Sequence, residues 1–138
     1  MLLENQLCFA LYSTSMAMTK IYKPLLDEIG LTYPQYVVML VLWEGDDLTV
    51  SGIGERLILD SGTLTPLLKR LEAAALITRL REANDERCVR IKLTPAGSKL
   101  KTKAAKIPGC IFRATQLSRP ELIALTKEIN ALRLRLTS

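Results

Sequence analysis

The sequence predicts a mostly α-helical fold with one small β-hairpin that follows two closely spaced helices. Leucines recur at three- and four-residue intervals within residues 60–79, which is the period of a helix with one apolar face. A shorter helical segment, residues 49–57, comes directly before it, so that a tight turn joins the two. Residues 77–81 and 87–93 alternate between apolar and polar side chains on either side of a polar turn, as paired strands do. Together these patterns predict a winged helix-turn-helix.

Composition excludes several classes of protein. With 138 residues, of which 49% are apolar, the chain is long enough for one domain with a hydrophobic core. It has no histidine, which excludes His-based acid–base catalysis and argues against a catalytic metal site. Its cysteines, Cys8, Cys88 and Cys110, lack the spacing of a disulfide scaffold or a zinc site. We therefore expect a cytoplasmic protein with no cofactor, no metal, no secretion signal and no membrane span.

Positive charge is concentrated towards the end of the chain. The net charge is +5. Residues 1–48 carry two Lys/Arg against six Asp/Glu, whereas residues 95–138 carry nine against two. A basic excess favours a polyanionic partner such as nucleic acid.

Two helices are expected before the helix-turn-helix. Residues 4–29 carry a wide apolar band at helical spacing, which requires burial on more than one side, and Gly30 can end this helix. Thr32 can cap a second helix, with Pro34 in the first turn, where its missing N–H does no harm. This helix is almost continuously apolar up to Trp43 and is expected to form the core.

The expected helix at residues 60–79 has two contrasting faces. Asp60 or Ser61 can cap its start. Leucines form one face, and the other carries hydroxyls near the N-terminus and cations further along. Such a face suits a DNA major groove, although a solvated surface helix has the same composition. The residues expected to face DNA are Ser61, Thr63, Thr65, Lys69 and Arg70.

The hairpin is expected to form the wing. Its turn is the polar segment at residues 82–86, and Arg87 beside the tip is placed to enter an adjacent minor groove. In the second strand, alternation predicts Val89, Ile91 and Leu93 on the inner side and Arg90 and Lys92 on the outer side.

Two helices are expected after the wing. Thr94 caps the first, which runs to about Ala105, and Pro108-Gly109 interrupts it. Ser118 caps the last, which is amphipathic.

The chain is expected to form a single domain, residues 1–138, and a homodimer. Its terminal helices are amphipathic, so the simplest arrangement packs them together and against a second copy about a two-fold axis. The dimerisation helices are then 4–30 and 95–138, and the winged helix-turn-helix DNA-binding region is 31–94.

Several segments resemble a known family. The order of elements and the wing segment DERCVRIKLTPAG at residues 85–97 resemble the MarR-type regulators. Further segments resemble the organic hydroperoxide resistance regulators (OhrR) within that family, over nearly the whole chain. They are ENQLCFALY at 4–12, YKPLL at 22–26, LTYPQY at 31–36 and LDSGTLTPLLKRLE at 59–72.

The resemblance implies functional roles for particular residues. Cys8 matches the peroxide-sensing cysteine of that branch, and Tyr12, Tyr22 and Tyr33 match the tyrosines around it. In the branch, the tyrosines at Tyr22 and Tyr33 hydrogen-bond the sulfur across the dimer interface. The resemblance also implies a DNA-contacting wing that includes Asp85 and Arg87.

The residues around Cys8 are consistent with this chemistry. A thiolate is the nucleophile that attacks a peroxide O–O bond. No Lys or Arg lies within a helical turn of Cys8, so tyrosine hydroxyls such as that of Tyr12, one turn later, are the available donors. Apolar neighbours such as Phe9 and Leu11 favour an organic peroxide. The alternative is a small cysteine that only fills space in the core.

The other cysteines and Ala75 leave questions open. Some members of the branch carry a second cysteine in the C-terminal region that forms an intersubunit disulfide with the sensor. Cys110 is a candidate for it because it follows Pro108-Gly109, where a bend is expected; a low-molecular-weight thiol is the alternative. Cys88 is expected to be inert. Ala75 stands where a glycine often ends the recognition helix in this family.

The sequence thus predicts a transcriptional repressor and not an enzyme. The reduced homodimer would bind a palindromic double-stranded DNA operator, and organic hydroperoxide would oxidise Cys8 and release the DNA. One alternative is a repressor of the same family that is released by a non-covalent aromatic ligand. Another is a thiol peroxidase using Cys8, which the absence of His or a nearby Arg disfavours.

Overall fold

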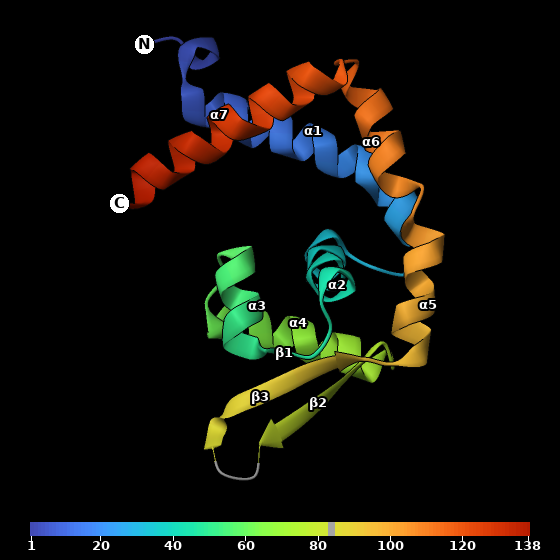
Figure 1. Ribbon diagram of the computed structural model, residues 1–138. Coiled ribbons are helices and arrows are strands. Elements are labelled where there is room, and N and C mark those ends of the chain that lie inside the picture. Colours follow the sequence, from blue (N-terminus) through green and yellow to red (C-terminus); the bar gives the residue numbers. More distant parts are fainter. Residues whose placement is uncertain (83–84) are drawn as a thin grey trace. The chain divides into compact units, whose positions relative to one another are not determined.

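The computed structural model describes residues 1–82 and 85–138, and describes side chains outside residues 82–87. Ten helices and strands follow an initial 3-10 turn, η1 (Leu3–Asn5) (Figure 1). In chain order they are α1 (Leu7–Asp27), α2 (Tyr33–Glu44), β1 (Leu48–Thr49), α3 (Val50–Leu57), α4 (Ser61–Ala73), β2 (Ile77–Glu82), β3 (Asp85–Leu93), α5 (Pro95–Ala104), α6 (Ile107–Thr115) and α7 (Arg119–Thr137).

The chain divides into two compact units, Met1–Ala105 and Lys106–Ser138. The first unit contains a winged helix-turn-helix, in which α3 and α4 are followed by the β2–β3 hairpin (Figure 1). The predicted mostly helical architecture with a small β-wing is therefore confirmed.

The first helix starts later than predicted. Gln6 is extended and separates η1 from α1, so that the helix begins at Leu7 instead of Glu4. Gly30 has a positive φ of 70°, and the Leu31 N–H donates to the Leu26 carbonyl across it. This is the Schellman arrangement that glycine favours, so Gly30 ends the helical segment as expected.

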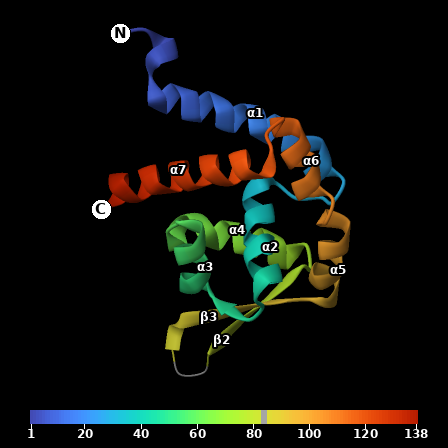
Figure 2. The same cartoon turned by 45° about the horizontal axis from the view of Figure 1, so that its top comes forward.

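Helix α2 is the core of the first unit and lies among α3, α4 and α5 (Figure 2). Its cap is the predicted Thr32, whose side chain accepts from the Gln35 N–H while the Gln35 side chain accepts from the Thr32 N–H. Trp43 at its far end donates its indole N–H to the Gly97 carbonyl at 3.0 Å. The side chains it buries are Tyr36, Val38, Met39, Val41 and Leu42.

Helix α4, the second helix of the helix-turn-helix, is shorter than the predicted segment 60–79. It begins after Asp60 as expected but ends at Ala73. Ala75 then adopts a left-handed conformation with φ 61°, and the Leu76 N–H donates to the Leu71 carbonyl. A Schellman motif therefore ends the helix at the position where the family often has glycine, and β2 follows directly.

The sheet has three strands in the order β1-β3-β2, of which the two-residue β1 was not predicted. Leu48 pairs with Ile91 and Thr49 with Arg90. The hairpin strands are longer than expected, because Glu82 and the segment 85–86 of the predicted turn belong to β2 and β3. The predicted turn residues 83 and 84 lie outside the described residues. Ile91 is fully buried as expected.

The second unit differs from the prediction at Pro108-Gly109. The break between α5 and α6 lies before these residues, because α5 ends at Ala104 and α6 begins at Ile107. Pro108 and Gly109 occupy the first turn of α6, where proline is tolerated. Helix α7 begins as predicted, with Ser118 and Glu121 forming a reciprocal capping box.

Candidate DNA-binding surface and cysteine site

The outer face of α4 carries the residues predicted to contact DNA. Asp60 caps the helix, since its carboxylate accepts from the Thr63 N–H at 2.7 Å. This hydrogen bond to the Thr63 backbone holds the pKa of Asp60 below its usual range, so the cap is ionised at neutral pH. Thr65 is half-buried, whereas the others are exposed: Ser61, Thr63, Lys69 and Arg70.

Close packing between α3 and α4 orients this face. Leu64, Leu68 and Leu71 on the inner side of α4 are fully buried, as is Ile53 on α3. Gly54 allows the turn between the helices, because a Cβ there would lie only 2.8 Å from the Leu59 carbonyl oxygen. The inner leucines thus leave the hydroxyls and cations of α4 on the opposite, exposed side.

Three residues, 74–76, separate the end of α4 from the first strand of the wing. Asp85 and Arg87 are placed on β3 by the backbone, but their side chains lie outside the described residues. Arg90, expected to point outwards, is instead half-buried and bonded to Asp47, with its Nε 2.8 Å from the Asp47 carboxylate. Asp47 did not stand out in the sequence as a functional residue.

Cys8 lies in the first turn of α1 and is exposed. Within the described part of a single chain, its thiol has no hydrogen-bond partner. Its place at the helix N-terminus puts it where the helix dipole favours a negative charge. The sequence predicted that the helix starts at Glu4, which would have placed Cys8 in the second turn and not at the N-terminus. Exposure also excludes the alternative of a cysteine that fills space within its own chain.

Three tyrosines form a cluster between α1 and α2. The ring centroids of Tyr22 and Tyr33 are 4.9 Å apart, and Tyr36 lies 5.9 Å from Tyr22 and 6.3 Å from Tyr33. Burial, with the neighbouring Tyr33 and Tyr36, raises the pKa of Tyr22 to about 12. Burial and then Tyr33 raise the pKa of Tyr36 as well. Tyr36 was absent from the predicted site, although it lies one helical turn after Tyr33.

A single chain does not bring Cys8 and this cluster together. Cys8 and Tyr22 lie on the same helix, fourteen residues apart. A helix rises about 1.5 Å per residue, so this separation corresponds to about 21 Å. Tyr12, at 61% exposed, lies between them and makes no ring contact with the cluster among the described residues.

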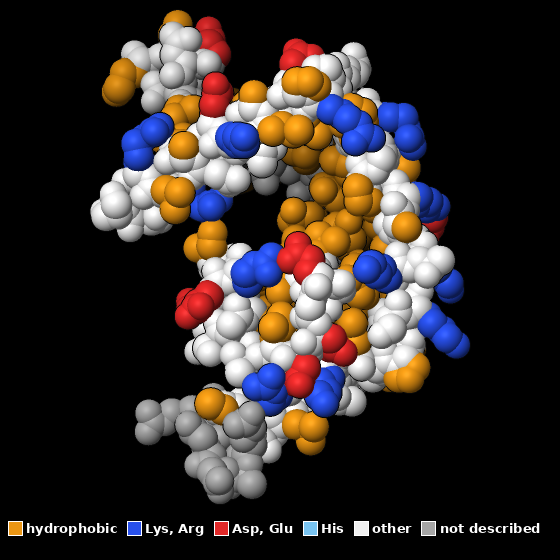
Figure 3. Space-filling view, viewed as in Figure 1, with side chains coloured by type: hydrophobic (Ala, Val, Ile, Leu, Met, Phe, Trp, Pro, Cys, Tyr) orange, Lys and Arg blue, Asp and Glu red, His pale blue; other side chains and the backbone are white. Residues whose placement is uncertain are grey.

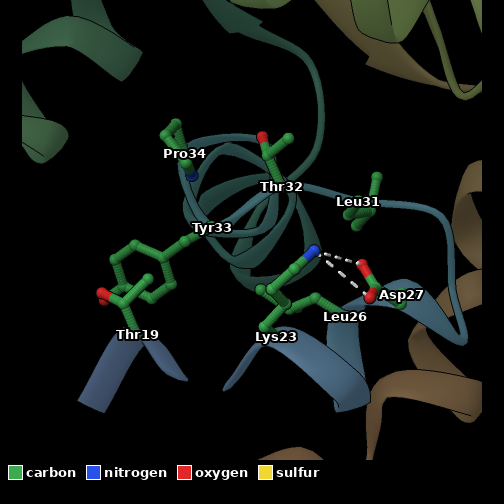
Figure 4. Close-up of a pocket in the computed structure, with 8 residues that line it drawn as sticks. All are labelled: Thr19, Lys23, Leu26, Asp27, Leu31, Thr32, Tyr33 and Pro34. Carbon is green, nitrogen blue, oxygen red and sulfur yellow. Dashed lines mark hydrogen bonds and ion pairs between the residues drawn. The ribbon is translucent and has the colours of Figure 1, made fainter. Parts of the chain in front are cut away.

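A cavity of about 290 Å³ adjoins the cluster (Figure 4). The aromatic ring of Tyr33 borders it, and Lys23 and Asp27 form an ion pair at 3.4 Å on its other side. The remaining lining residues are Thr19, Leu26, Leu31, Thr32 and Pro34.

The other two cysteines lie on regular elements. Cys110 is half-buried in α6, and Arg113 donates from Nη2 towards its sulfur at 3.4 Å. Cys88 is half-buried on β3.

The described residues form neither a metal site nor a membrane-spanning helix. No cluster of His, Cys, Asp or Glu able to hold a metal ion occurs among them. None of their helices is long and apolar enough to cross a membrane.

The proteins and the family model that this chain matches are all transcriptional regulators. A family model described as transcriptional regulator SarA/Rot matches residues 20–104. The organic hydroperoxide resistance transcriptional regulator of Bacillus subtilis is 54% identical over 132 residues, which are 96% of this chain and 90% of the relative. The HTH-type transcriptional regulator SarZ of Staphylococcus saprophyticus is 40% identical over 127 residues, which are 92% and 87% of the two chains.

Among solved structures, reduced AbfR bound to DNA superposes with a TM-score of 0.82 at 35% identity, covering 99% of this chain and 95% of AbfR. AbfR, from Staphylococcus epidermidis, is also known overoxidised and bound to DNA, and in a disulfide form. All these relatives are regulators, which agrees with a chain that is not an enzyme. The chain is therefore a DNA-binding transcriptional regulator and belongs to the MarR family, in its organic hydroperoxide resistance branch.

Proposed function

We propose that this protein is a homodimeric repressor that releases its operator when an organic hydroperoxide oxidises Cys8. The observation that carries the proposal is the separation of Cys8 from the tyrosine cluster. Cys8 is exposed at one end of α1, and Tyr22 lies about 21 Å further along the same helix. Only a second copy, arranged antiparallel about a two-fold axis, can bring a cluster to each cysteine.

In such a dimer the tyrosines serve as donors to the sulfur. With its pKa raised to about 12, Tyr22 keeps its proton at physiological pH and can donate to a thiolate. The ring contact with Tyr33 holds two hydroxyl-bearing side chains side by side. The N-terminus of α1 adds a positive partial charge near Cys8.

Oxidation proceeds by displacement at the peroxide bond. The Cys8 thiolate attacks the distal oxygen of the hydroperoxide, so that an S–O bond forms while the O–O bond breaks. The alkoxide that leaves takes up a proton and departs as an alcohol. Cysteine is oxidised to a sulfenic acid, and the peroxide is reduced.

A second thiol then completes the switch. The thiolate of Cys110 from the partner, or of a low-molecular-weight thiol, attacks the sulfenic sulfur. The S–S bond forms as the S–O bond breaks, and the hydroxide that leaves takes up a proton to become water. Arg113 Nη2 lies 3.4 Å from the Cys110 sulfur and donates towards it. That overoxidised AbfR is found on DNA favours disulfide formation, and not oxygen addition, as the releasing step.

Release follows from the geometry of DNA recognition. A dimer presents two α4 helices to successive major grooves, about 34–36 Å apart. A disulfide between the ends of the dimerisation helices changes that spacing. The side chains of α4 that contact the operator are Ser61, Thr63, Thr65, Lys69 and Arg70, and Asp85 and Arg87 serve the wing.

The test combines mass and DNA binding. Reduced wild type, Cys8→Ser and Cys110→Ser receive one equivalent of cumene hydroperoxide, followed by intact mass spectrometry without reductant. We expect a covalent dimer in the wild type only. The oxidised wild type should also lose affinity for a duplex of about 40 base pairs that has been enriched beforehand from a random pool. Cys8→Ser should bind that duplex as the wild type does. Release of DNA from oxidised Cys8→Ser would refute the mechanism.

The cavity beside Tyr33 favours a second candidate, a repressor released by a non-covalent aromatic ligand. Its volume of about 290 Å³ and the Lys23 ammonium suit an aromatic acid. This candidate predicts that salicylate releases DNA from Cys8→Ser and from the wild type equally.

A further inference from the structure

We propose that Asp46 and Asp47 act as a latch that holds the wing in the orientation needed to bind DNA. The latch comprises these two carboxylates and their partners on β3, namely Arg90, Lys92 and the backbone of Leu93. The proposal concerns DNA binding itself and is independent of peroxide sensing.

Asp47 holds two side chains of the wing strand. Its carboxylate lies 2.8 Å from Arg90 Nε and 3.9 Å from Lys92 Nζ, and its backbone carbonyl accepts from Arg90 Nη2 at 2.9 Å. The guanidinium thus binds a side chain and a main chain of the same residue, which fixes its plane as well as its position. The hydrogen bond from Arg90 lowers the pKa of Asp47, so the carboxylate is charged at neutral pH.

Asp46 holds the strand backbone. Its Oδ1 accepts from the Leu93 N–H at 2.8 Å and from the Asp47 N–H at 2.7 Å. Strand β1 pairs only with Arg90 and Ile91, so the carboxylate of Asp46 continues the edge of β3 where the β1 ladder stops. The Asp46 bond therefore ties the base of the wing to the segment that follows α2.

The backbone between α2 and β1 is shaped for these contacts. Asp47 has φ 62°, a left-handed conformation that most residues disfavour and that Asp and Asn adopt more readily. A strained residue persists when the surrounding contacts determine its conformation. Here the contacts that determine it are those of the Asp46 and Asp47 carboxylates with β3.

The latch also assigns a role to the cations at the wing base. Acidic and basic side chains lie next to one another above the wing on the face seen in Figure 3. Arg90 and Lys92 both lie within ion-pair distance of Asp47, so in the latch their role is to hold the wing. A recognition helix and a wing must meet one duplex together, so a wing that swings loses affinity.

The experiment measures binding of the reduced protein to the enriched duplex by fluorescence anisotropy at several salt concentrations. The variants are Asp47→Asn, Arg90→Gln and the double variant. Asn keeps the tolerance for a left-handed φ while removing the charge. Glu44→Gln is the matched control, because Glu44 forms an exposed ion pair with Arg56 on α3 that involves no residue of β3. Thermal unfolding of each variant monitors the fold.

We expect each single variant to weaken binding about five-fold, as for the loss of a charge-assisted hydrogen bond. The double variant should lose no more than either single one. The slope of log affinity against log salt should stay unchanged, because no phosphate contact is removed. Glu44→Gln should bind as the wild type does.

Two results would overturn the latch. If Asp47→Asn binds DNA more tightly with a steeper salt slope, Asp47 merely masks Arg90 and Lys92 from phosphate. If it binds with unchanged affinity, the contacts are an ordinary surface ion pair. If the wild-type protein selects no duplex from the random pool, the proposal that this protein recognises an operator fails, and the latch fails with it.

Discussion

Tyr22 is half-buried between Tyr33 and Tyr36, and these surroundings determine its protonation. Its own burial is the largest cause of its raised pKa, and the two neighbouring phenols add to it. The neutral form therefore persists to higher pH in the folded protein than it does in a tyrosine with the ordinary pKa of 10.0.

The raised pKa of Tyr22 predicts a loss of stability at high pH. A folded pKa of about 12 lies above the ordinary 10.0, so the folded state retains the proton longer than the unfolded state. The free energy of unfolding should be unaffected by Tyr22 below pH 10 and fall as the pH rises from about 10 to about 12. Urea unfolding of the wild type and Tyr22→Phe across this range measures the difference. Equal pH dependence in both proteins would contradict the assignment.

Arg90 illustrates a residue whose neighbours in sequence do not indicate its role. The alternating pattern correctly placed it on the opposite face from Ile91, but predicted only that it faces outwards. Its partner Asp47 lies 43 positions earlier, so only folding brings the two together.

At the level of helices and strands, local signals located most ends. Thr32, Thr94 and Ser118 each accept a hydrogen bond from a backbone N–H in the first turn, as predicted from the sequence. The misplaced ends were those of α1 at Leu7 and α4 at Ala73. At the latter, Ala75 takes a conformation that alanine disfavours.

The end of α4 predicts a stabilising substitution. Ala75→Gly relieves a left-handed φ at the cost of a more flexible unfolded chain, so the free energy of unfolding should rise by about 0.5–1 kcal/mol. Ala73→Gly, two residues earlier in the last turn of the helix, should lower it by about 0.5–1 kcal/mol. Urea unfolding followed by circular dichroism measures both. If both glycines destabilise, the left-handed assignment at Ala75 is wrong.

The sequence did not predict β1 and α6, and both elements are short. β1 has two residues and exists because it pairs with β3, and α6 begins at a proline-glycine pair that elsewhere ends helices. Neither has a hydrophobic period long enough to be recognised in sequence.

At the scale of the whole molecule, large apolar side chains remain exposed on the terminal helices. On α1 they include Leu7, Phe9, Leu11 and Met16, and on α7 Ile123, Leu125, Ile129 and Leu134. Large apolar side chains gathered on one exposed helix in this way mark an interaction site. A second copy of the chain is the partner we infer, because the tyrosine cluster can reach a cysteine only across a two-fold axis.

The dimer predicts the effect of one charge on α7. Ile129 is 41% exposed, and Ile129→Glu places a carboxylate in the inferred interface. We expect analytical ultracentrifugation to show monomers, and affinity for the enriched duplex to fall at least ten-fold, because one recognition helix replaces two. Lys127→Glu, a charge change on the same helix, should leave the dimer intact. A dimeric Ile129→Glu would place the interface elsewhere.

The sequence by itself determined the features that depend on near neighbours. Helix and strand periods, side-chain caps and the order of elements arise from interactions within a few residues. They were sufficient to predict the winged helix-turn-helix, and the exposure of four of the five α4 residues expected to face DNA. The family resemblance, from the same residues, indicated Cys8 and its tyrosines.

Tertiary structure alone decided which distant groups meet. It placed Tyr36 with Tyr22 and Tyr33, Trp43 against Gly97, and Asp47 against Arg90. It also located Cys8 in a helical first turn, away from the cluster of Tyr22, Tyr33 and Tyr36 in its own chain. These juxtapositions depend on how whole helices pack, and the packing energy is shared among many side chains, so no local pattern records them.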